Sequence, residues 1–362
     1  MNNNITASLS KYLLIFIGII ALTFSTLTIS ANENMPEQKK EFDAGEMIFE
    51  HVLDAHDWHI ISIGEHHIAI PLPIIIFDKD ERVIHVFSSS RLAHEANYLG
   101  YKLPAEGEFK GKLIKESAGN SDSIIDFSIT KTVFSIMFSA FLLILIFVSI
   151  AQSYKKRKDQ APKGLQSMLE PLILFIRDDV AKSAIGSKEY MRFMPFLLTV
   201  FFFIFLNNLM GIIPIFPGGS NVTGNIGITM VLAVFTFVIT SFNGSKSYWT
   251  HMINMPGVPW WLKFPIPLMP IVEIMGVFTK PFVLMVRLFA NMLAGHIVVL
   301  GFMSMIFIFG AINEYMGLGV SVVSVAFSVF LSLLELLVAF IQAYVFTLLS
   351  SIYIGMALEK HH

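Results

Sequence analysis

The chain has 362 residues, of which 54% are hydrophobic and 14% are charged, with a formal net charge of −2. A typical soluble domain carries about 25% charged residues, so this composition excludes an ordinary soluble globular protein. The sequence contains no cysteine, which excludes disulfides, thiolate metal sites and cysteine nucleophiles. Several apolar runs exceed twenty residues, and they predict an all-α polytopic membrane protein.

Residues 1–31 are typical of a secretory signal peptide. Lys11 precedes the apolar stretch YLLIFIGIIALTF, and small residues ending at Ala31 supply a cleavage point. Ile29 fits the cleavage pattern poorly, so an uncleaved anchor helix is the alternative. With a cytoplasmic amino terminus, both interpretations place the following segment outside the cytoplasm.

Residues 32–130 are expected to form an acidic domain outside the membrane. Residues 58–77 and 82–90 are rich in β-branched side chains and alternate in part with polar ones, which is typical of short strands. The turn-forming run DKDE separates them, and residues 41–56 predict a short amphipathic helix. We therefore predict a small periplasmic α+β domain ahead of the membrane domain, which begins at residue 131.

Seven of the eleven histidines lie between residues 51 and 94. The spacing of His56 and His59, and the run Glu65-His66-His67, would allow metal ligation, but no tetrahedral set is dictated by it. We expect surface histidines on a capping domain, with metal ligation as the alternative.

Five spans are predicted in the mature chain: residues 133–153, 193–213, 225–242, 269–310 and 320–358. The first ends at the basic cluster KKRK, which the positive-inside rule places in the cytoplasm. That cluster is interpreted as a topology signal and not as a contact to nucleic acid. Residues 164–185 are too charged to span, and they predict an amphipathic helix on the cytoplasmic surface. The carboxyl terminus then also lies in the cytoplasm.

The last two apolar segments are too long for ordinary spans. The second has 39 residues, or about 58 Å as a continuous helix, against a hydrocarbon core of about 30 Å. Either each segment is broken, or the two form a long, steeply tilted helical hairpin around residues 312–319. A hairpin of that kind implies a large partner in the membrane.

Arg287 is the most informative residue of the membrane domain. Only seven charged side chains lie between residues 193 and 358. An arginine at the centre of a membrane helix costs about 2.5–3.5 kcal/mol and cannot shed its proton, so it marks a functional site. Glu273, Lys280 and Arg287 are spaced by seven residues and share one helical face, which Asn291 continues.

Antiparallel pairing of the two long segments brings His296 to Glu335 and Arg287 to Gln342, because facing positions have a nearly constant sum of residue numbers. His296 lies nine residues beyond Arg287 and therefore on the opposite side of its helix. One side presents a permanent positive charge outward, and the other holds a titratable pair suited to relaying protons. The alternative is that these polar groups only neutralise each other and tie the helices together.

Four stretches carry a resemblance to a known family. KPFVLMVRLFANMLAGH and LLVAFIQAYVFTLLSSIYIGMALE resemble subunit a of the rotary F-type ATP synthases. FLNNLMGIIP and NVTGNIGITMVL resemble the earlier spans of that family. The resemblance covers about residues 125–360, and the acidic amino-terminal domain departs from the family's short form.

The resemblance implies a proton-conducting stator subunit with two offset half-channels beside a ring of c subunits. Arg287 matches the arginine that faces the ring carboxylates, and Gln342 matches a glutamine beside it. His296 and Glu335 match the interacting pair of the outer half-channel, which some members hold in exchanged order.

Four further residues are assigned by the same resemblance. Asn208 and Asn225 match polar residues near the outer half-channel. Glu273 matches a carboxylate near the cytoplasmic exit, and Asn291 matches a residue one turn from the arginine.

The implied partners are the c-subunit ring, the b-subunit peripheral stalk, the remaining F-type ATP synthase subunits and membrane lipid. ATP is made on other subunits of such a complex, so we expect no catalytic residue, no cofactor and no metal here, and no nucleic-acid partner. The implied location is the inner membrane of a bacterium. A self-contained secondary transporter, which usually shows internal repeats, and a membrane scaffold with an exported binding domain are the alternatives.

Overall fold

The computed structural model describes residues 43–63, 66–104, 109, 111–116, 123–156, 160–213, 218–253 and 268–359. The predicted signal peptide and residues 32–42 of the acidic domain lie outside these residues.

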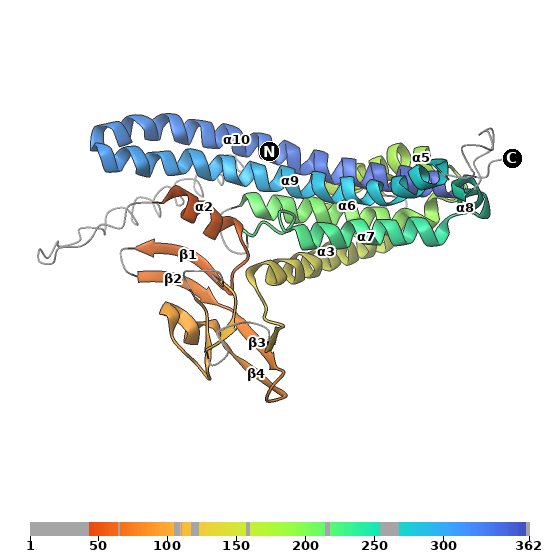
Figure 1. Cartoon of the computed structure of the whole chain (residues 1–362). Helices are drawn as coiled ribbons and strands as arrows, with labels where there is room; N and C mark the ends of the chain where they lie inside the picture. The colour runs from red at the N-terminus through yellow and green to blue at the C-terminus, as the bar shows by residue number, and fades with distance from the viewer. Residues whose placement is uncertain are drawn as a thin grey trace, which may run out of the picture. The chain divides into compact units, whose positions relative to one another are not determined.

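A small α+β domain precedes the first membrane helix, as predicted (Figure 1). It contains helix α2 (Ala44–Val52), a short 3₁₀ helix η1 (Ser89–Glu95) and three antiparallel sheets, with strand orders β1-β2, β4-β3-β7 and β5-β6. The strands are β1 (Asp57–Ile63), β2 (His66–Pro71), β3 (Pro73–Asp78), β4 (Val83–Ser88), β5 (Tyr101–Lys102), β6 (Ile114–Lys115) and β7 (Ile124–Asp126).

Strand β3 is the centre of the largest sheet. Its Ile74 and Ile76 are fully buried and form a core with Phe87 of β4 and Ile124 of β7. The alternation of buried and less buried side chains along β3 follows from the two-residue period of a strand. The DKDE run forms the β3–β4 turn, as its composition predicts.

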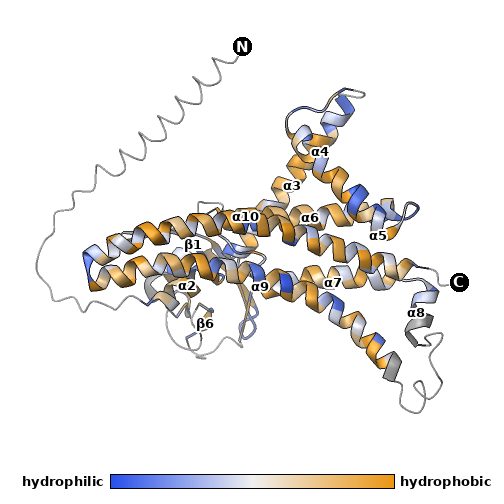
Figure 2. Cartoon of the chain, turned by 90° about the horizontal axis from the view of Figure 1, so that it is seen from above, coloured by the Kyte–Doolittle hydropathy of each residue, from blue (hydrophilic) through white to orange (hydrophobic). Residues whose placement is uncertain are grey.

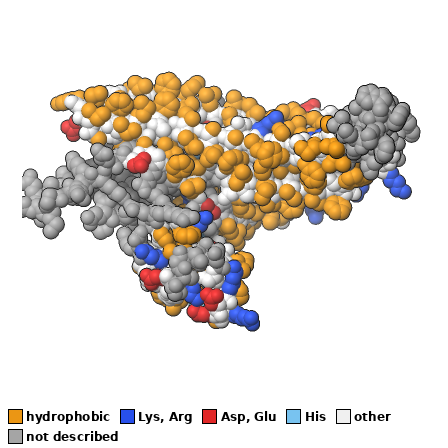
Figure 3. Space-filling view, in the orientation of Figure 1, with side chains coloured by type: hydrophobic (Ala, Val, Ile, Leu, Met, Phe, Trp, Pro, Cys, Tyr) orange, Lys and Arg blue, Asp and Glu red, His pale blue; other side chains and the backbone are white. Residues whose placement is uncertain are grey.

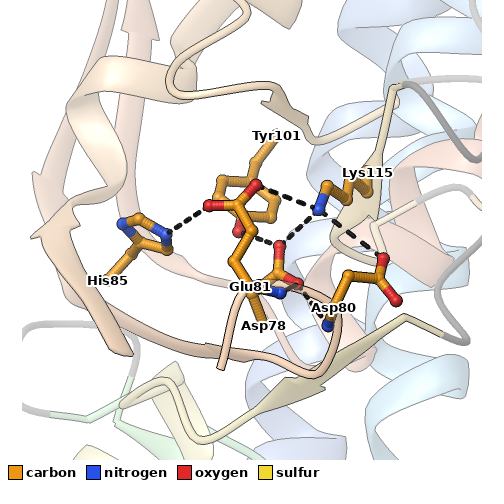
Figure 4. A network of polar contacts seen from close by, with 6 residues as sticks. All are labelled: Asp78, Asp80, Glu81, His85, Tyr101 and Lys115. Atoms are coloured by element: carbon orange, nitrogen blue, oxygen red, sulfur yellow. Dashed lines mark hydrogen bonds and ion pairs between the residues drawn. The ribbon is translucent and has the colours of Figure 1, made fainter. Parts of the chain in front are cut away.

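A buried carboxylate joins that turn to the β5–β6 hairpin (Figure 4). Asp78 Oδ2 accepts hydrogen bonds from Lys115 Nζ (2.6 Å) and the Tyr101 hydroxyl (2.7 Å), and Oδ1 accepts the backbone N–H groups of Asp80 and Glu81. The hydrogen bond from Lys115 holds the pKa of Asp78 well below its ordinary value, although burial opposes it. Four donors thus keep a charged group in the core of this domain.

The domain is braced against the first membrane helix, α3 (Lys131–Lys156). The backbone N–H of Lys131 donates to Ala55 O (2.8 Å), and the N–H of Thr132 donates to Asp54 Oδ1 (3.0 Å). These bonds satisfy two of the N–H groups that a helix leaves unpaired at its start.

Five of the described helices are long and apolar enough to cross a membrane. They are α3, α6 (Tyr190–Ile212), α7 (Ile226–Asn243), α9 (Leu268–Ile312) and α10 (Glu314–Leu358). Apolar side chains cover most of their visible surface, whereas many of the charged side chains lie on the strand-containing domain (Figure 3). The predicted all-α polytopic fold with five spans is confirmed.

The segment predicted to be an amphipathic helix is helical but interrupted. It comprises α4 (Leu165–Phe175), a π-helical stretch η2 (Ile176–Lys182) and the short α5 (Ser183–Ile185). Ser351 of α10 donates a hydrogen bond to Val180 O (3.1 Å), so the segment packs on the end of α10. A further short helix, α8 (Lys246–Ile253), follows α7.

Helices α9 and α10 are unbroken, have 45 residues each and form an antiparallel hairpin (Figures 1 and 2). Of the two alternatives the unbroken hairpin is therefore present, and its steep tilt in a membrane stays a prediction. The predicted turn over residues 312–319 is wrong, because Asn313 alone connects the helices. Its side chain caps α10 by accepting the N–H of Tyr315 (2.9 Å). The tip is tight, since a β-carbon at Gly317 would lie 2.7 Å from Gly310 Cα.

Candidate functional site

The predicted contact between His296 and Glu335 is present. His296 Nδ1 lies 2.6 Å from Glu335 Oε1, and the two side chains are 13% and 9% exposed. A β-carbon at Gly295 would lie 3.0 Å from Glu335 Oε1, so the glycine lets the carboxylate approach the backbone of α9. The register of the hairpin therefore places a titratable pair inside the helical bundle.

The other edge of the imidazole faces helix α6. A β-carbon at Gly211 would lie 3.6 Å from His296 Nε2 and 3.5 Å from Ser220 O. His296 thus lies between the carboxylate of α10 on one side and the loop that connects α6 with α7 on the other.

That loop and the end of α6 hold a cluster of buried polar residues: Asn207, Asn208, Ser220, Asn221 and Thr223. The Thr223 hydroxyl donates to Asn208 Oδ1 (2.5 Å). Among the described residues, Asn207 Oδ1, Ser220 Oγ and Asn221 Nδ2 are buried without a hydrogen-bond partner. Buried polar groups of this kind are ordinarily satisfied by water.

The cluster adjoins the titratable pair through α10 as well. Asn208 Nδ2 donates to Ala339 O (3.4 Å), and Ala339 lies one turn from Glu335. The predicted site residue Asn208 is therefore at the centre of a polar region beside Glu335. The side chain of Asn225 caps α7 by accepting the N–H of Gly227 (2.9 Å). Its place near the outer half-channel stays a prediction.

Four residues of this cluster, Asn207, Ser220, Asn221 and Thr223, are absent from the sequence-based assignment. Asn207 directly precedes the assigned Asn208, and the signal for the other three was the polar run within residues 220–223. Polar residues are ordinary in a loop between two spans, so the composition gave no reason to single them out. Their complete burial, which only the fold reveals, distinguishes them.

Arg287 lies on the outer surface of α9. Its side chain is exposed among apolar neighbours, and no hydrogen bond or ion pair of Arg287 occurs within the described part of the chain. Asn291, Ala290 and Ala294 are also exposed and follow it along the same face. The predicted separation of Arg287 from His296 on opposite sides of the helix is found.

The predicted pairing of Arg287 with Gln342 is not formed by the described residues. Gln342 is 7% exposed and faces the interior, seven residues from Glu335 on the same side of α10. A constant sum of residue numbers specifies the level of two residues along a hairpin, but not the direction of each side chain. Arg287 points outward at the level of Gln342.

A second polar region lies at the other end of α9. A cavity there is lined by residues from α7, α8, α9 and α10, including Thr240, Ser241, Tyr248, Lys280 and Tyr353. Among the described atoms, the hydroxyls of Thr240 and Ser241 are buried without a hydrogen-bond partner, and Lys280 Nζ lies 5.7 Å from the centre of the Tyr353 ring.

Glu273 belongs to this second region. Burial raises the pKa of Tyr248 on α8, and the negative charge of Glu273 raises it further. Lys280 is sixteen residues from His296, or about 24 Å along α9 at 1.5 Å per residue. The two polar regions are therefore well separated.

Metal ligation by the amino-terminal histidines receives no support from the described residues, none of which form a group of three or more potential His, Asp or Glu ligands. His56 Nε2 lies 2.9 Å from Asp126 Oδ2. Glu65 and the side chains of His59, His66 and His67 lie outside the description.

Comparison with known proteins gives two family matches. A family described as ATP synthase A chain matches residues 133–355, and a domain of unknown function matches residues 47–130. ATP synthase subunit a of Chloroherpeton thalassium is 46% identical over 244 residues, which cover 65% of this chain and 69% of that protein.

Two further relatives show similar agreement. ATP synthase subunit a 2 of Chlorobaculum tepidum is 48% identical over 239 residues, which span 64% of each protein. ATP synthase subunit a of Myxococcus xanthus is 43% identical over 254 residues, covering 68% of this chain and 78% of the relative. As the resemblance in the sequence predicted, the chain belongs to the ATP synthase A chain family.

Proposed function

We propose that this chain is the proton-conducting stator subunit of an F-type ATP synthase. In this proposal it lies in the inner membrane of a bacterium, beside a ring of c subunits and a b-subunit peripheral stalk. Two offset half-channels deliver protons to the ring carboxylates and remove them. ATP is made on other subunits, so this chain has no active site for covalent chemistry.

The observation that carries the proposal is the exposed guanidinium of Arg287, which has no ion pair within the described part of the chain. A charge at such a position in lipid needs a partner, and the described residues supply no acid that pairs with it. A carboxylic acid on a neighbouring subunit would complete the pair. The small, exposed Ala290 and Ala294 on the same face would let a partner helix approach closely.

The chemistry of arginine suits this role. An opposite charge within about 4–6 Å lowers the pKa of a carboxyl by about 1–3, so an acid that arrives protonated beside Arg287 would release its proton. Arginine does not give up its own proton in a protein. A fixed guanidinium would therefore make each ring carboxylic acid release its proton as it passes. It would also prevent protons from moving directly between the two half-channels.

We assign the outer half-channel to the region around His296 and Glu335. Water held by Asn207, Ser220 and Asn221 would bring protons to Nε2 of the imidazole. Release from Nδ1 to Glu335 would then pass them across the hairpin toward the ring. The 2.6 Å contact between the two side chains supports this step.

We assign the inner half-channel to the polar region around Glu273 and Lys280. Its distance of about 24 Å from His296 along α9 supports two paths that do not join. Proton flow would then require the ring to turn.

The orientation and domain division are part of the proposal. Residues 1–31 would be the signal peptide, residues 32–130 the periplasmic domain and residues 131–362 the membrane domain. Lys155 and Lys156 in the last turn of α3 support a cytoplasmic end for that helix.

The test is ATP-driven proton pumping in inverted membrane vesicles. Arg287→Ala should abolish pumping while the complex remains assembled, because the ring carboxylates would no longer be discharged. Val283→Ala, an exposed position one turn away on α9, is the matched control and should pump normally. Normal pumping by Arg287→Ala would overturn the proposal.

A further inference from the structure

The β4-β3-β7 sheet has a second apolar face, opposite its core. Its open face includes two rows of three residues: Ile84, Phe77 and Ile125 in one row, and Val86, Ile75 and Phe127 in the other. The pair of Pro73 and Ser88 continues the face beyond the second row. Residues paired across antiparallel strands point to the same face, so each row is continuous. Ile84, Val86 and Phe127 are 63%, 66% and 63% exposed.

An open face of this composition is unusual. An antiparallel sheet with one solvated face normally alternates apolar residues inside with polar residues outside. Here all six residues of the two rows are Ile, Val or Phe, and Ser88 at the end of β4 is the polar member of this face, although the domain around it is acidic. β4 is also an edge strand, which adds unpaired backbone groups to the apolar surface. A contiguous exposed apolar patch marks an interaction site.

The sheet is held close to a membrane span. Phe127 precedes the first residue of α3 by four positions, which corresponds to at most about 14 Å of extended chain. Beyond β7 the pairing with β3 continues, since Ile129 N donates to Pro73 O (3.1 Å). The domain end of α3 is further fixed by an edge-to-face contact between the rings of Trp58 and Phe134, 5.7 Å apart.

Helix α3 also carries an exposed apolar face near this sheet. Val133, Met137 and Phe141 are exposed and share one helical face. The 26 residues of α3 measure about 39 Å, which exceeds the hydrocarbon core of about 30 Å, so its first turn lies near the lipid headgroups.

We propose that the open face of this sheet rests on the outer leaflet of the membrane. Apolar faces at membrane surfaces insert about 5–10 Å into the boundary between headgroups and acyl chains, a depth within reach of a sheet tied this closely to α3. A protein partner is disfavoured because the energetic centres of protein interfaces are enriched in Trp, Tyr and Arg, and the open face has none of them. This inference rests on the proposed orientation, in which α3 spans the membrane with Lys131 at the outer side, and it does not depend on proton conduction.

Because the chain contains no cysteine, a single introduced cysteine gives one labelling position in this subunit. Val86→Cys, labelled with the fluorophore NBD, places a probe on the open face. The whole complex is reconstituted in phosphatidylcholine vesicles in which some lipids carry a nitroxide on the acyl chain. The probe at position 86 should lose most of its emission to the lipid-borne nitroxide and be protected from iodide in the water.

Val83→Cys is the matched control. Val83 lies on the same strand, on the other face, and is 45% exposed. Its probe should be quenched by iodide and unaffected by the lipid nitroxide. Phe127→Cys provides a second probe of the open face in case the Val86 variant fails to assemble.

Two results would overturn the inference. Protection of position 86 from both quenchers would mean that protein covers the open face, and quenching by iodide equal to that at position 83 would mean that water does. ATP-driven pumping is recorded on the same vesicles, so loss of lipid contact and loss of proton transport are distinguished.

Discussion

His296 joins two polar environments through the two nitrogens of one ring. Nδ1 lies 2.6 Å from Glu335 Oε1, and Nε2 faces Gly211 and the α6–α7 loop. An imidazole can accept a proton at one nitrogen and release one at the other, so this placement suits a relay between the loop and α10.

Exchange of the two partners should preserve more activity than removal of either. His296→Ala and Glu335→Ala should each lower ATP-driven pumping by about a hundredfold, which is typical for loss of a proton-transfer group. The double variant His296→Glu with Glu335→His keeps both groups in contact and should pump faster than either single variant. Pumping rates in inverted vesicles check this, and a double variant as inactive as the single ones would contradict the relay.

The space beside Gly211 should be needed for access to His296. A β-carbon there makes ordinary contacts of 3.5–3.7 Å with Ser220 and the imidazole, so Gly211→Ala should pump almost normally. Gly211→Leu would fill the space between Nε2 and the polar loop and should slow pumping severalfold in an assembled complex. Equal rates for the two variants would show that protons do not pass this point.

The tip of the α9–α10 hairpin should tolerate alanine at Gly319 but not at Gly317. A β-carbon at Gly317 would lie 2.7 Å from Gly310 Cα, whereas one at Gly319 meets no atom within 4 Å. Gly317→Ala should therefore destabilise the hairpin by about 1–3 kcal/mol, the usual cost of overfilling a tight contact. The measurement is the fraction of subunit that stays soluble on heating in detergent, and Gly319→Ala should match the unaltered chain.

The amino-terminal domain should lose stability in acid through Asp78. Its pKa is lowered on folding, so its contribution is complete above the ordinary aspartate value of about 3.9 and is lost as the pH falls below that value. Asp78→Ala should make the domain protease-sensitive already at neutral pH, because Lys115 and the Tyr101 hydroxyl lose their shared acceptor.

The control for that experiment is Asp80→Ala. Asp80 lies 3.6 Å from Lys115 Nζ but is 63% exposed, so its ion pair is screened by water and its loss should change little. Equal protease sensitivity of the two variants at neutral pH would contradict the structural role of Asp78.

Spacing in the sequence predicted the levels of residues along the hairpin but not the direction of every side chain. The match of His296 with Glu335 followed from helical geometry, because both residues face the seam between two helices. Arg287 and Gln342 also lie at the same level along the hairpin, but their side chains point in different directions. The amide of Gln342 is buried inside the bundle, whereas the guanidinium of Arg287 is exposed on its outer surface. The turn is short because the side chain of Asn313 caps α10, and the periodicity of apolar residues does not predict such a cap.

The polar cluster around Asn208 could be predicted only in part. Asn208 was assigned through the resemblance of FLNNLMGIIP to the family, whereas Asn207 beside it was not. Ser220 and Asn221 belong to a loop that folds back against α6, where Gly219 N donates to Met210 O (3.0 Å). The packing of this loop against α6 is a tertiary contact, which no local sequence pattern predicts.

The unbroken length of α9 and α10 has a geometric consequence for the proposed proton path. Forty-five residues measure about 68 Å, more than twice the thickness of the hydrocarbon core, so a hairpin that stays within the bilayer would be strongly tilted from the membrane normal. Distance along α9 then becomes largely sideways displacement in the plane of the bilayer. Under the proposed function, Glu273 and His296 would therefore lie at different positions around the c ring, and a ring carboxylate that left one half-channel would reach the other only when the ring turned.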